Sequence, residues 1–387
     1  MHSLRSLCLA VAFALHAASA AEARIVLHAA VGGELTTYAV DVNSATLARQ
    51  ASVKLPENVQ EAWPHPSGRF LYVAWSNNAA DKTGSHGVTA FRVDGATGVL
   101  HPHGKPIQVP ARSVFLTVDV PGQHVIVAYN QPSRATVHRI GADGMLGAEV
   151  RQSGGLDFGV YAHQVRMHPS NRMVVVVTRG NAASVDKPED PGALKVFGYR
   201  DGVLRNRASI APNGGRNFQP RHLDFHPSRP LAYVTIEAQN KLHVYGVVDG
   251  PSLSAAPLFA KETLADPRRT GQATSAIHVH PSGRFVYLGN RGAAGGENSI
   301  AVYSIDPRTG EPVLIQSAGT HGVHPRTFTI DPGGRLLVVA NMVRAGDVPA
   351  SLVLFRIGAD GKLTFVRRYE QDGGGNLFWT GMMRLPE

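Results

Sequence analysis

The chain has 387 residues, with 38 lysines and arginines against 29 aspartates and glutamates, and a formal net charge of +9. The basic residues are scattered rather than clustered beside aromatic residues, which argues against a nucleic-acid groove, and the excess charge favours small anionic molecules or an anionic surface. The only cysteine is Cys8, which excludes a disulfide framework, a thiolate metal site and a cysteine nucleophile in the folded domain.

Residues 1–20 have the pattern of a secretory signal. Arg5 supplies a positive charge, residues 7–17 form an apolar segment, and Ala18-Ser19-Ala20 is a small-residue cleavage site. Such a segment is too short to span a bilayer of ~30 Å, so we expect cleavage and no membrane insertion. The sequence therefore predicts a periplasmic or secreted protein with a signal peptide at 1–20 and a single domain at 21–387.

A turn signal centred on proline recurs six times. Its first copy reads His65-Pro66-Ser67-Gly68-Arg69, and the prolines of the six copies are Pro66, Pro121, Pro169, Pro227, Pro281 and Pro332. The copies are about 53 residues apart on average, which is the length of a four-stranded β-propeller blade. Seven such blades fit the chain.

Apolar segments follow these turns at regular places. We expect buried strands at 70–73, 173–177, 231–234, 285–288 and 336–339, and a further strand after each, at 87–93, 194–199, 241–247, 299–305 and 351–357. No segment has helical periodicity. The 25 prolines and 41 glycines are therefore interpreted as turn residues.

The two ends of the chain complete the ring. Residues 24–55 supply three strands and residues 377–385 supply one more, so together they make the seventh blade. Sharing one sheet between the termini removes an open edge that would invite aggregation. The predicted fold is all-β, a seven-bladed β-propeller of four-stranded antiparallel blades, closed by N- and C-terminal strands in one blade.

Polar residues occupy the strand ends opposite the proline turns. Because each turn closes a hairpin, we expect the residues six before and ten after the proline to be cross-strand partners at the far end of the blade. The first set is Gln60, Phe115, His163, Arg221, Ser275 and Arg326, and the second is Ser76, Gln131, Arg179, Glu237, Arg291 and Met342. With the first set on the innermost strands, one mouth of the central channel becomes a cationic pocket with a single carboxylate.

The alternative interpretation is that these residues have no function and are simply exposed to solvent at the blade ends, since arginine is usually exposed. The repeat register favours convergence instead, because unrelated surface residues would not gather at one rim. The histidines of the turns, His65, His168, His226 and His280, occur once per blade. We expect them to pack or cap the turns and not to bind a metal.

The chain resembles the seven-bladed lactonase family, which includes propeller-type 6-phosphogluconolactonases, carboxy-cis,cis-muconate cyclases and exported gluconolactonase-like proteins. The motifs that carry the resemblance are Gln219-Pro220-Arg221-His222 with Phe225-His226-Pro227 and Glu237, Tyr287-Leu288-Gly289-Asn290-Arg291, and His324-Pro325-Arg326-Thr327-Phe328. The resemblance implies an active site of His163, Arg221, Glu237 and Arg291. We assign substrate binding to His222, Asn290 and Arg326.

Two segments depart from the family pattern. Thr178-Arg179-Gly180-Asn181 stands where relatives often carry an Asp-rich stretch and is followed by an insert at 182–191, and a second insertion covers 344–349. Loops at the mouth shape a pocket, so the identity of the lactone stays open.

Hydrolysis of a lactone needs a base for water, donors for the oxyanion and an acid for the alkoxide. We expect Glu237 or His163 to activate water, Arg221 and Arg291 to stabilise the oxyanion or bind a substrate carboxylate, and Arg326 and His222 to orient the ring. No cofactor is expected, and no metal, because the rim lacks the carboxylate cluster that calcium prefers.

The predicted function is thus an exported, metal-independent lactonase acting on a small-molecule sugar lactone such as gluconolactone. Two alternatives stay open: a carboxymuconate-type lactonising cyclase, and a non-catalytic envelope propeller that binds a ligand or partner at its mouth. The sequence does not indicate the oligomeric state.

Overall fold

The strands form where runs of β-branched and aromatic residues are bounded by turns. The computed structural model describes residues 24–79, 83–343, 348–371 and 375–386. The expected signal peptide at 1–20, with Cys8, and residues 344–347 of the expected insertion lie outside the described residues.

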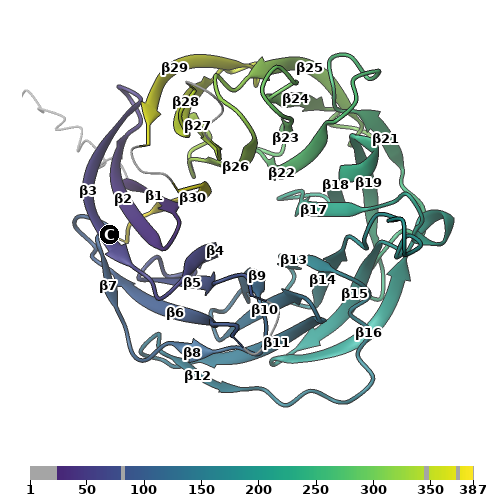
Figure 1. Cartoon of the computed structure of the whole chain (residues 1–387), viewed down its shortest axis with the longest axis horizontal. Coiled ribbons are helices and arrows are strands. Elements are labelled where there is room, and N and C mark those ends of the chain that lie inside the picture. The colour runs from purple at the N-terminus through teal and green to yellow at the C-terminus, as the bar shows by residue number, and fades with distance from the viewer. Residues whose placement is uncertain (1–23, 80–82, 344–347, 372–374, 387) are drawn as a thin grey trace, which may run out of the picture.

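Seven antiparallel sheets are arranged around a central axis like the blades of a propeller (Figure 1). The innermost strands are β4 (Asn58–Pro64), β9 (Ser113–Val118), β13 (Ala162–Met167), β17 (Pro220–Phe225), β22 (Ala273–Val279), β26 (Pro325–Ile330) and β30 (Leu377–Arg384). The second strands are β5 (Phe70–Ser76), β10 (His124–Asn130), β14 (Met173–Thr178), β18 (Leu231–Ile236), β23 (Phe285–Arg291), β27 (Leu336–Asn341) and β1 (Ile25–Val31). These second strands include every buried strand that the sequence predicts.

The outer half of each blade is more variable. The third strands are β6 (His86–Val93), β11 (Ser133–Ile140), β15 (Ala193–Arg200), β19 (Lys241–Val248), β24 (Ser299–Ile305), β28 (Ser351–Ile357) and β2 (Glu34–Asp41). The outer positions hold β7 (Leu100–Pro102) with β8 (Ile107–Gln108), β12 (Leu146–Glu149), β16 (Val203–Ile210), β20 (Ser252–Leu253) with β21 (Phe259–Glu262), β25 (Pro312–Gly319), β29 (Leu363–Glu370) and β3 (Thr46–Lys54). Two blades therefore divide the fourth position between two short strands.

The predicted ring closure is confirmed. β30 pairs antiparallel with β1, and the sheet runs β3-β2-β1-β30, so the two ends of the described chain share one blade. Within the described residues the helices are two short 3-10 turns, η1 (Pro212–Gly215) and η2 (Glu237–Gln239). No helix in this part of the protein has the length and apolar character needed to cross a membrane.

The core lies between neighbouring blades. One cluster, for example, packs Ile126 and Val137 of one blade against Val174 and Val176 of the next, and all four are fully buried. The second strands are almost completely buried because both of their faces meet a neighbouring blade, which explains why their sequences are continuous apolar runs and not alternating ones.

The histidines of the proline turns act as the sequence predicts. His226 Nδ1 accepts hydrogen bonds from the backbone N–H groups of Ser228 and Arg229, and its Nε2 donates to the carbonyl of Gly283 in the next blade at 2.9 Å. His65 and His280 make the equivalent contacts to Gly122 and Gly334, at 3.0 and 2.9 Å. Each of these histidines caps its own turn and joins it to the following blade.

Candidate functional site

A register shift interrupts the innermost strand of every blade close to the mouth of the channel. Between Val59↔Trp75 and Glu61↔Ala74, for example, β4 has one extra residue, Gln60. The residues at these shifts are Gln60, Val114, His163, Arg221, Ser275, Arg326 and Phe378. A β-bulge re-aims the side chain that it inserts, and all of these residues except Ser275 line one cavity at the mouth.

The same shifts make the expected cross-strand pairing wrong. Ser76 faces Asn58 and not Gln60, and Arg291 faces Ala273 and not Ser275. The difference is two residues: beside the turn the ladder is already one residue from the expected register, since Glu61 faces Ala74 and not Trp75, and the inserted residue adds one more. Side chains alternate with a period of two, so this displacement leaves the predicted residues on the same face and at the same mouth.

The mouth cavity has a volume of about 200 Å³ and is strongly cationic. Its wall contains the guanidinium groups of Arg112, Arg179, Arg221, Arg291 and Arg326. Aromatic and amide groups hold three of them: Arg179 lies over the ring of Tyr161, Arg326 lies 3.8 Å from the ring centroid of Phe378, and Arg112 Nε donates to Gln60 Oε1 at 3.0 Å.

The carboxylate of Glu237 lies behind these guanidinium groups. η2 begins at Glu237, directly after β18, and the side chain is only 11% exposed. Its oxygens accept hydrogen bonds from Arg221 Nη1, at 3.2 Å, and from Arg291 Nη2, while Arg179 Nη1 is 3.9 Å away. Burial raises the pKa of Glu237, but attraction to these three arginines outweighs burial and holds the pKa below its usual value.

His163 is a neutral base candidate in the cavity wall. Burial, followed by repulsion from Arg221, lowers its pKa well below the usual value, so the ring is uncharged at neutral pH. Nδ1 is buried and has no hydrogen-bond partner among the described residues. Nε2 is left as the nitrogen that can meet a molecule in the cavity.

Arg221, Arg291 and Arg326 are charged side chains of the cavity wall, and some of their N–H groups have no hydrogen-bond acceptor. Arg291 Nη1 donates to His324 Nε2 at 3.3 Å, and burial together with repulsion from Arg221 lowers the pKa of Arg291 to about 9, so it stays charged at neutral pH. Within the described part of the chain, Nε and Nη2 of Arg221 and Nε of Arg326 have no partner. An anion in the cavity would satisfy such groups.

Two assigned substrate-binding residues do not line the mouth cavity. Asn290 is fully buried and its side-chain amide donates to the carbonyl of Thr263 and to Ser299 Oγ, an arrangement that Asn341 repeats in its own blade. It is one residue before Arg291 and so faces the opposite side of the strand, where these hydrogen bonds hold its side chain. His222 lines a second cavity deeper in the channel, and its ring lies 5.1 Å from that of His163.

Sequence reasoning missed Arg112, Tyr161, Phe378 and His324 as site residues. Arg112 and Tyr161 precede their inner strands, and Phe378 lies in the blade that has no proline turn, so all three are outside the repeat register. His324 belongs to a motif that the sequence analysis quoted but gave no role. Burial lowers its pKa to about 4, which makes it an acceptor for Arg291.

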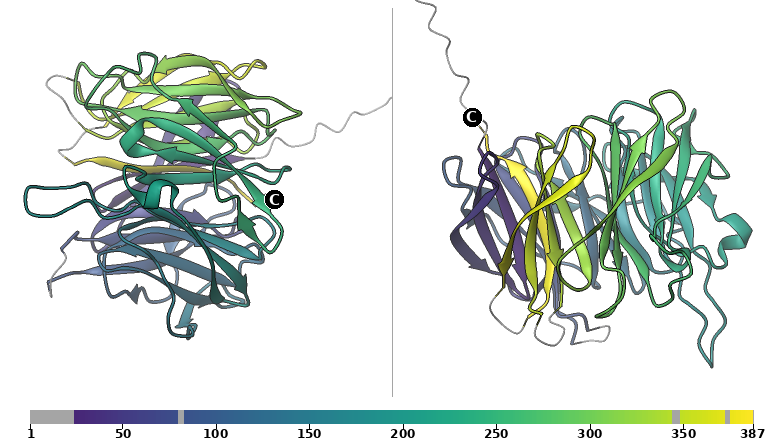
Figure 2. Two further views of the ribbon diagram at one scale, coloured as in Figure 1. Left: turned by 90° about the vertical axis from the view of Figure 1, so that its right-hand side faces the viewer. Right: turned by 90° about the horizontal axis from the view of Figure 1, so that it is seen from above.

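The insert at 182–191 begins three residues after Arg179 of the mouth and leads to β15. Its Asp190 accepts hydrogen bonds from Asn181, at 2.8 Å, and from Lys187, at 2.7 Å. Figure 2 shows the corresponding long loop, in teal, projecting from the face opposite to the C-terminus. In the ranges that the structure describes, no group of three His, Cys, Asp or Glu side chains is arranged to hold a metal ion.

Comparison with known proteins gives a consistent result. The sequence profile of the family described as "Lactonase, 7-bladed beta-propeller" matches residues 26–374. The 6-phosphogluconolactonase of Bacillus subtilis is 30% identical over 316 residues, covering 77% of this chain and 83% of that protein. The 6-phosphogluconolactonase of Serratia proteamaculans is 25% identical over 320 residues, covering 82% of this chain and 87% of that protein.

Solved structures share the fold. A periplasmic gluconolactonase of Pseudomonas aeruginosa superposes with a TM-score of 0.72 at 21% identity, covering 94% of this chain and 100% of that one. A protein from Bacteroides uniformis described as a putative 6-phosphogluconolactonase has a TM-score of 0.74 at 18% identity, with the same coverage. At these identities the likeness shows the fold alone.

Proposed function

Because the chain belongs to the lactonase family of seven-bladed β-propellers, we propose that its mouth cavity hydrolyses a sugar-derived lactone to the open acid. One observation carries the proposal: five guanidinium groups and a neutral imidazole converge on a cavity of about 200 Å³. This set supplies a base and oxyanion donors in one place, which are the groups that opening an ester ring requires.

His163 is the proposed general base. Its imidazole accepts a proton from water, the hydroxide adds to the lactone carbonyl, and the ring C–O bond breaks as the tetrahedral intermediate collapses. The imidazolium then returns its proton to the leaving alkoxide. The free nitrogen of a ring that is uncharged at neutral pH supports this assignment over Glu237, whose carboxylate is occupied by arginines.

Arg221 and Arg291 are the proposed oxyanion donors. Glu237 holds both guanidinium groups and is therefore a positioning residue, not a catalytic one. The cavity has five positive side chains and one adjacent carboxylate, so a lactone that carries its own carboxylate would be bound more strongly than a neutral one. Charge alone thus keeps the muconolactone-type alternative open beside glucono-1,5-lactone.

The test is proton release from glucono-1,5-lactone and from muconolactone, corrected for spontaneous hydrolysis. The wild-type protein should accelerate at least one of them, and His163→Gln should reduce kcat by roughly 10²- to 10⁴-fold, the usual contribution of a general base. His168→Gln is the matched control, since His168 lies in a proline turn at the other end of its blade. It should retain wild-type turnover.

Failure of every lactone to react faster with the protein than without it would support the non-catalytic alternative. Interconversion of muconolactone and cis,cis-muconate without net hydrolysis would support the cyclase. The steps above need no metal, so activity that dialysis against EDTA removes and that added metal restores would contradict the proposed mechanism.

We also propose that the protein is exported. The charged, apolar and small-residue segments of residues 1–20 support this location. Fractionation of the producing cells should place the protein outside the cytoplasm with an N-terminus near Ala21. A cytoplasmic protein that retains Met1 would contradict the proposal.

A further inference from the structure

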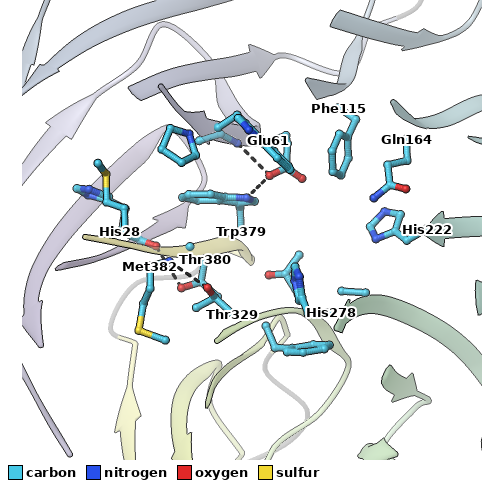
Figure 3. Close-up of a pocket in the computed structure, with 18 of the residues that line it drawn as sticks. His28, Glu61, Phe115, Gln164, His222, His278, Thr329, Trp379, Thr380 and Met382 are labelled. Carbon is cyan, nitrogen blue, oxygen red and sulfur yellow. Dashed lines mark hydrogen bonds between the residues drawn. The ribbon is translucent and has the colours of Figure 1, made fainter. Parts of the chain in front are cut away.

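A second cavity lies in the same channel, deeper than the mouth. It has a volume of about 280 Å³, close to the lower end of the ~300–1,000 Å³ typical of small-molecule sites. Its residues follow the mouth residues along the innermost strands: Glu61 and Trp63 come after Gln60 in β4, and His278 comes after Ser275 in β22. We call it the lower cavity (Figure 3).

A layer of rings separates the two cavities. His163 faces the mouth and His222 faces the lower cavity, with 5.1 Å between their ring centroids, and Phe115 meets His222 edge to face at 5.5 Å. The wall of the lower cavity carries the aromatic rings of Trp63, Phe115, Phe328 and Trp379. An aromatic molecule can therefore stack or meet edges on several sides.

Glu61 is the polar group that selects the ligand. It is buried, and one carboxyl oxygen, Oε1, accepts hydrogen bonds from the backbone of Ala62 and from Trp379 Nε1 (Figure 3). The other oxygen, Oε2, has no hydrogen bond within the described residues. Burial raises the pKa of Glu61 to about 8, although the two hydrogen bonds and the attraction of Arg326 and Arg166 act in the opposite direction. The carboxyl group is therefore protonated at neutral pH, and Oε2 can donate that proton in a hydrogen bond.

The remaining charges around the lower cavity cancel. Arg166 forms an ion pair with Asp224, and burial lowers the pKa of His222 and His278, which are neutral at pH 7. The titratable or charged groups that act on the cavity are His28, Glu61, Arg166, His222, Asp224 and His278, with Arg326 acting on Glu61 from the mouth. The lower cavity is thus uncharged, whereas the mouth is cationic.

We propose that the lower cavity is a second binding site, which takes a small uncharged aromatic molecule whose hydrogen-bond acceptor meets Glu61. The site is independent of lactone hydrolysis. A carboxylate of the same shape is excluded because it would lose its hydration without meeting an unpaired cation.

Two of the three tryptophans make this site directly observable. Trp63 and Trp379 line the cavity, whereas Trp75 is fully buried inside a blade, where its Nε1 donates to Thr89. Acetophenone, which has an aromatic ring and only an acceptor, and benzoate, its charged counterpart, form a matched pair of probes. At pH 7 acetophenone should quench tryptophan fluorescence saturably, with a Kd at least ten times lower than that of benzoate.

Two variants locate the binding. Ala276→Phe fills the cavity from β22 and should weaken acetophenone at least tenfold. Glu61→Gln replaces the carboxyl by an amide that keeps both an acceptor and a donor. Above pH 8 the wild type should lose affinity for acetophenone as Glu61 ionises, whereas Glu61→Gln should bind with the same Kd from pH 6 to pH 10.

Each variant is first checked by near-UV circular dichroism and by its melting temperature. The proposal is overturned by linear, non-saturable quenching, by equal affinity for the two probes, or by an Ala276→Phe protein that is folded and still binds acetophenone as the wild type does. If Ala276→Phe does not fold, the pH dependence of the wild type and of Glu61→Gln decides alone. Equal pH dependence in these two proteins would exclude Glu61 as the donor and overturn the proposal.

Discussion

At the scale of single residues, the mouth is organised around one carboxylate. Arg221 is 2% exposed and has only Glu237 as a carboxylate partner in the described structure, while Arg291 donates to the other oxygen of the same group. Guanidinium groups repel one another, so the negative charge between them lets two donors stay close together without losing their protons. Glu237 therefore sets the geometry of the two guanidinium groups that are the proposed oxyanion donors.

Replacing Glu237 by Gln should separate positioning from catalysis. We expect destabilisation of about 3–5 kcal/mol, because a buried ion pair loses one partner, and a fall in kcat/KM of roughly tenfold or more as the two guanidinium groups move apart. The acid limb of the pH profile should persist in this variant if His163 is the base. Glu370→Gln, at an exposed pair with Arg368, is the control for loss of charge.

A profile that becomes independent of pH in Glu237→Gln, with kcat reduced and KM unchanged, would identify Glu237 as the base instead. Lactone turnover and urea unfolding of the same protein samples measure both effects.

The sequence predicted this part of the site because repeat register is simple arithmetic on the proline turns. His163, Arg221, Glu237, Arg291 and Arg326 came from that register. The exact cross-strand pairs were wrong, because a one-residue bulge depends on the ladder and not on sequence spacing. Asn290 lies outside the mouth cavity, where its side chain bonds to Thr263 and Ser299, and its role in substrate binding stays a prediction.

At the scale of elements, the proline turn joins neighbouring blades. His226 is buried, and its ring bridges two backbone N–H groups of its own turn and the carbonyl of Gly283 in the next blade. The sequence predicted that these histidines cap turns. It could not show the bond to the next blade, because the partner is about one repeat away and is a backbone atom.

His226→Ala should therefore lower stability by about 1–3 kcal/mol, since the buried carbonyl of Gly283 and two partly buried N–H groups lose their partner. His168→Ala is the matched control. The ring of His168 forms hydrogen bonds with Ser170 in its own turn, and its contact with the next blade is an edge-to-face packing on Phe225. Thermal unfolding of both variants measures the difference. Equal losses would mean that the bond between blades contributes nothing.

At the scale of the whole molecule, buried imidazoles make stability depend on pH. His28 and His243 are buried, and burial lowers the pKa of each to about 4, while that of His324 is lowered to about 4 by burial and nearby arginines. The unfolded chain binds protons to these groups near pH 6.5, but the folded protein resists protonation until about pH 4.

These three imidazoles should make stability fall as the pH decreases from 6.5 to 4, because the unfolded state takes up more protons in that window. Glu61, whose pKa is raised to about 8, has the opposite sign: its contribution is lost as the pH rises towards 8, but it is one group against three. Differential scanning calorimetry from pH 8 to pH 4 measures this as a decreasing melting temperature. His28→Asn removes one such group and should make the decrease less steep. A melting temperature that rises on acidification would contradict the burial of these neutral rings.

Ring closure gives the last prediction. β30 pairs with β1 along its length, Trp379 Nε1 donates to Glu61 in one neighbouring blade, and Met382 N donates to Thr329 Oγ in the other, so this strand joins three sheets. A chain that stops at Asn376 would expose the edge of β1 and the sides of two blades. We expect it to aggregate, because unpaired edges recruit other strands.

A synthetic peptide of residues 377–386 should restore part of the monomer on size-exclusion chromatography, together with its near-UV circular dichroism. A chain lacking only residues 386–387 is the control and should behave as the full protein. A compact monomer with unchanged melting temperature after removal of β30 would show that the ring is held by the contacts between blades and does not depend on closure by strand pairing.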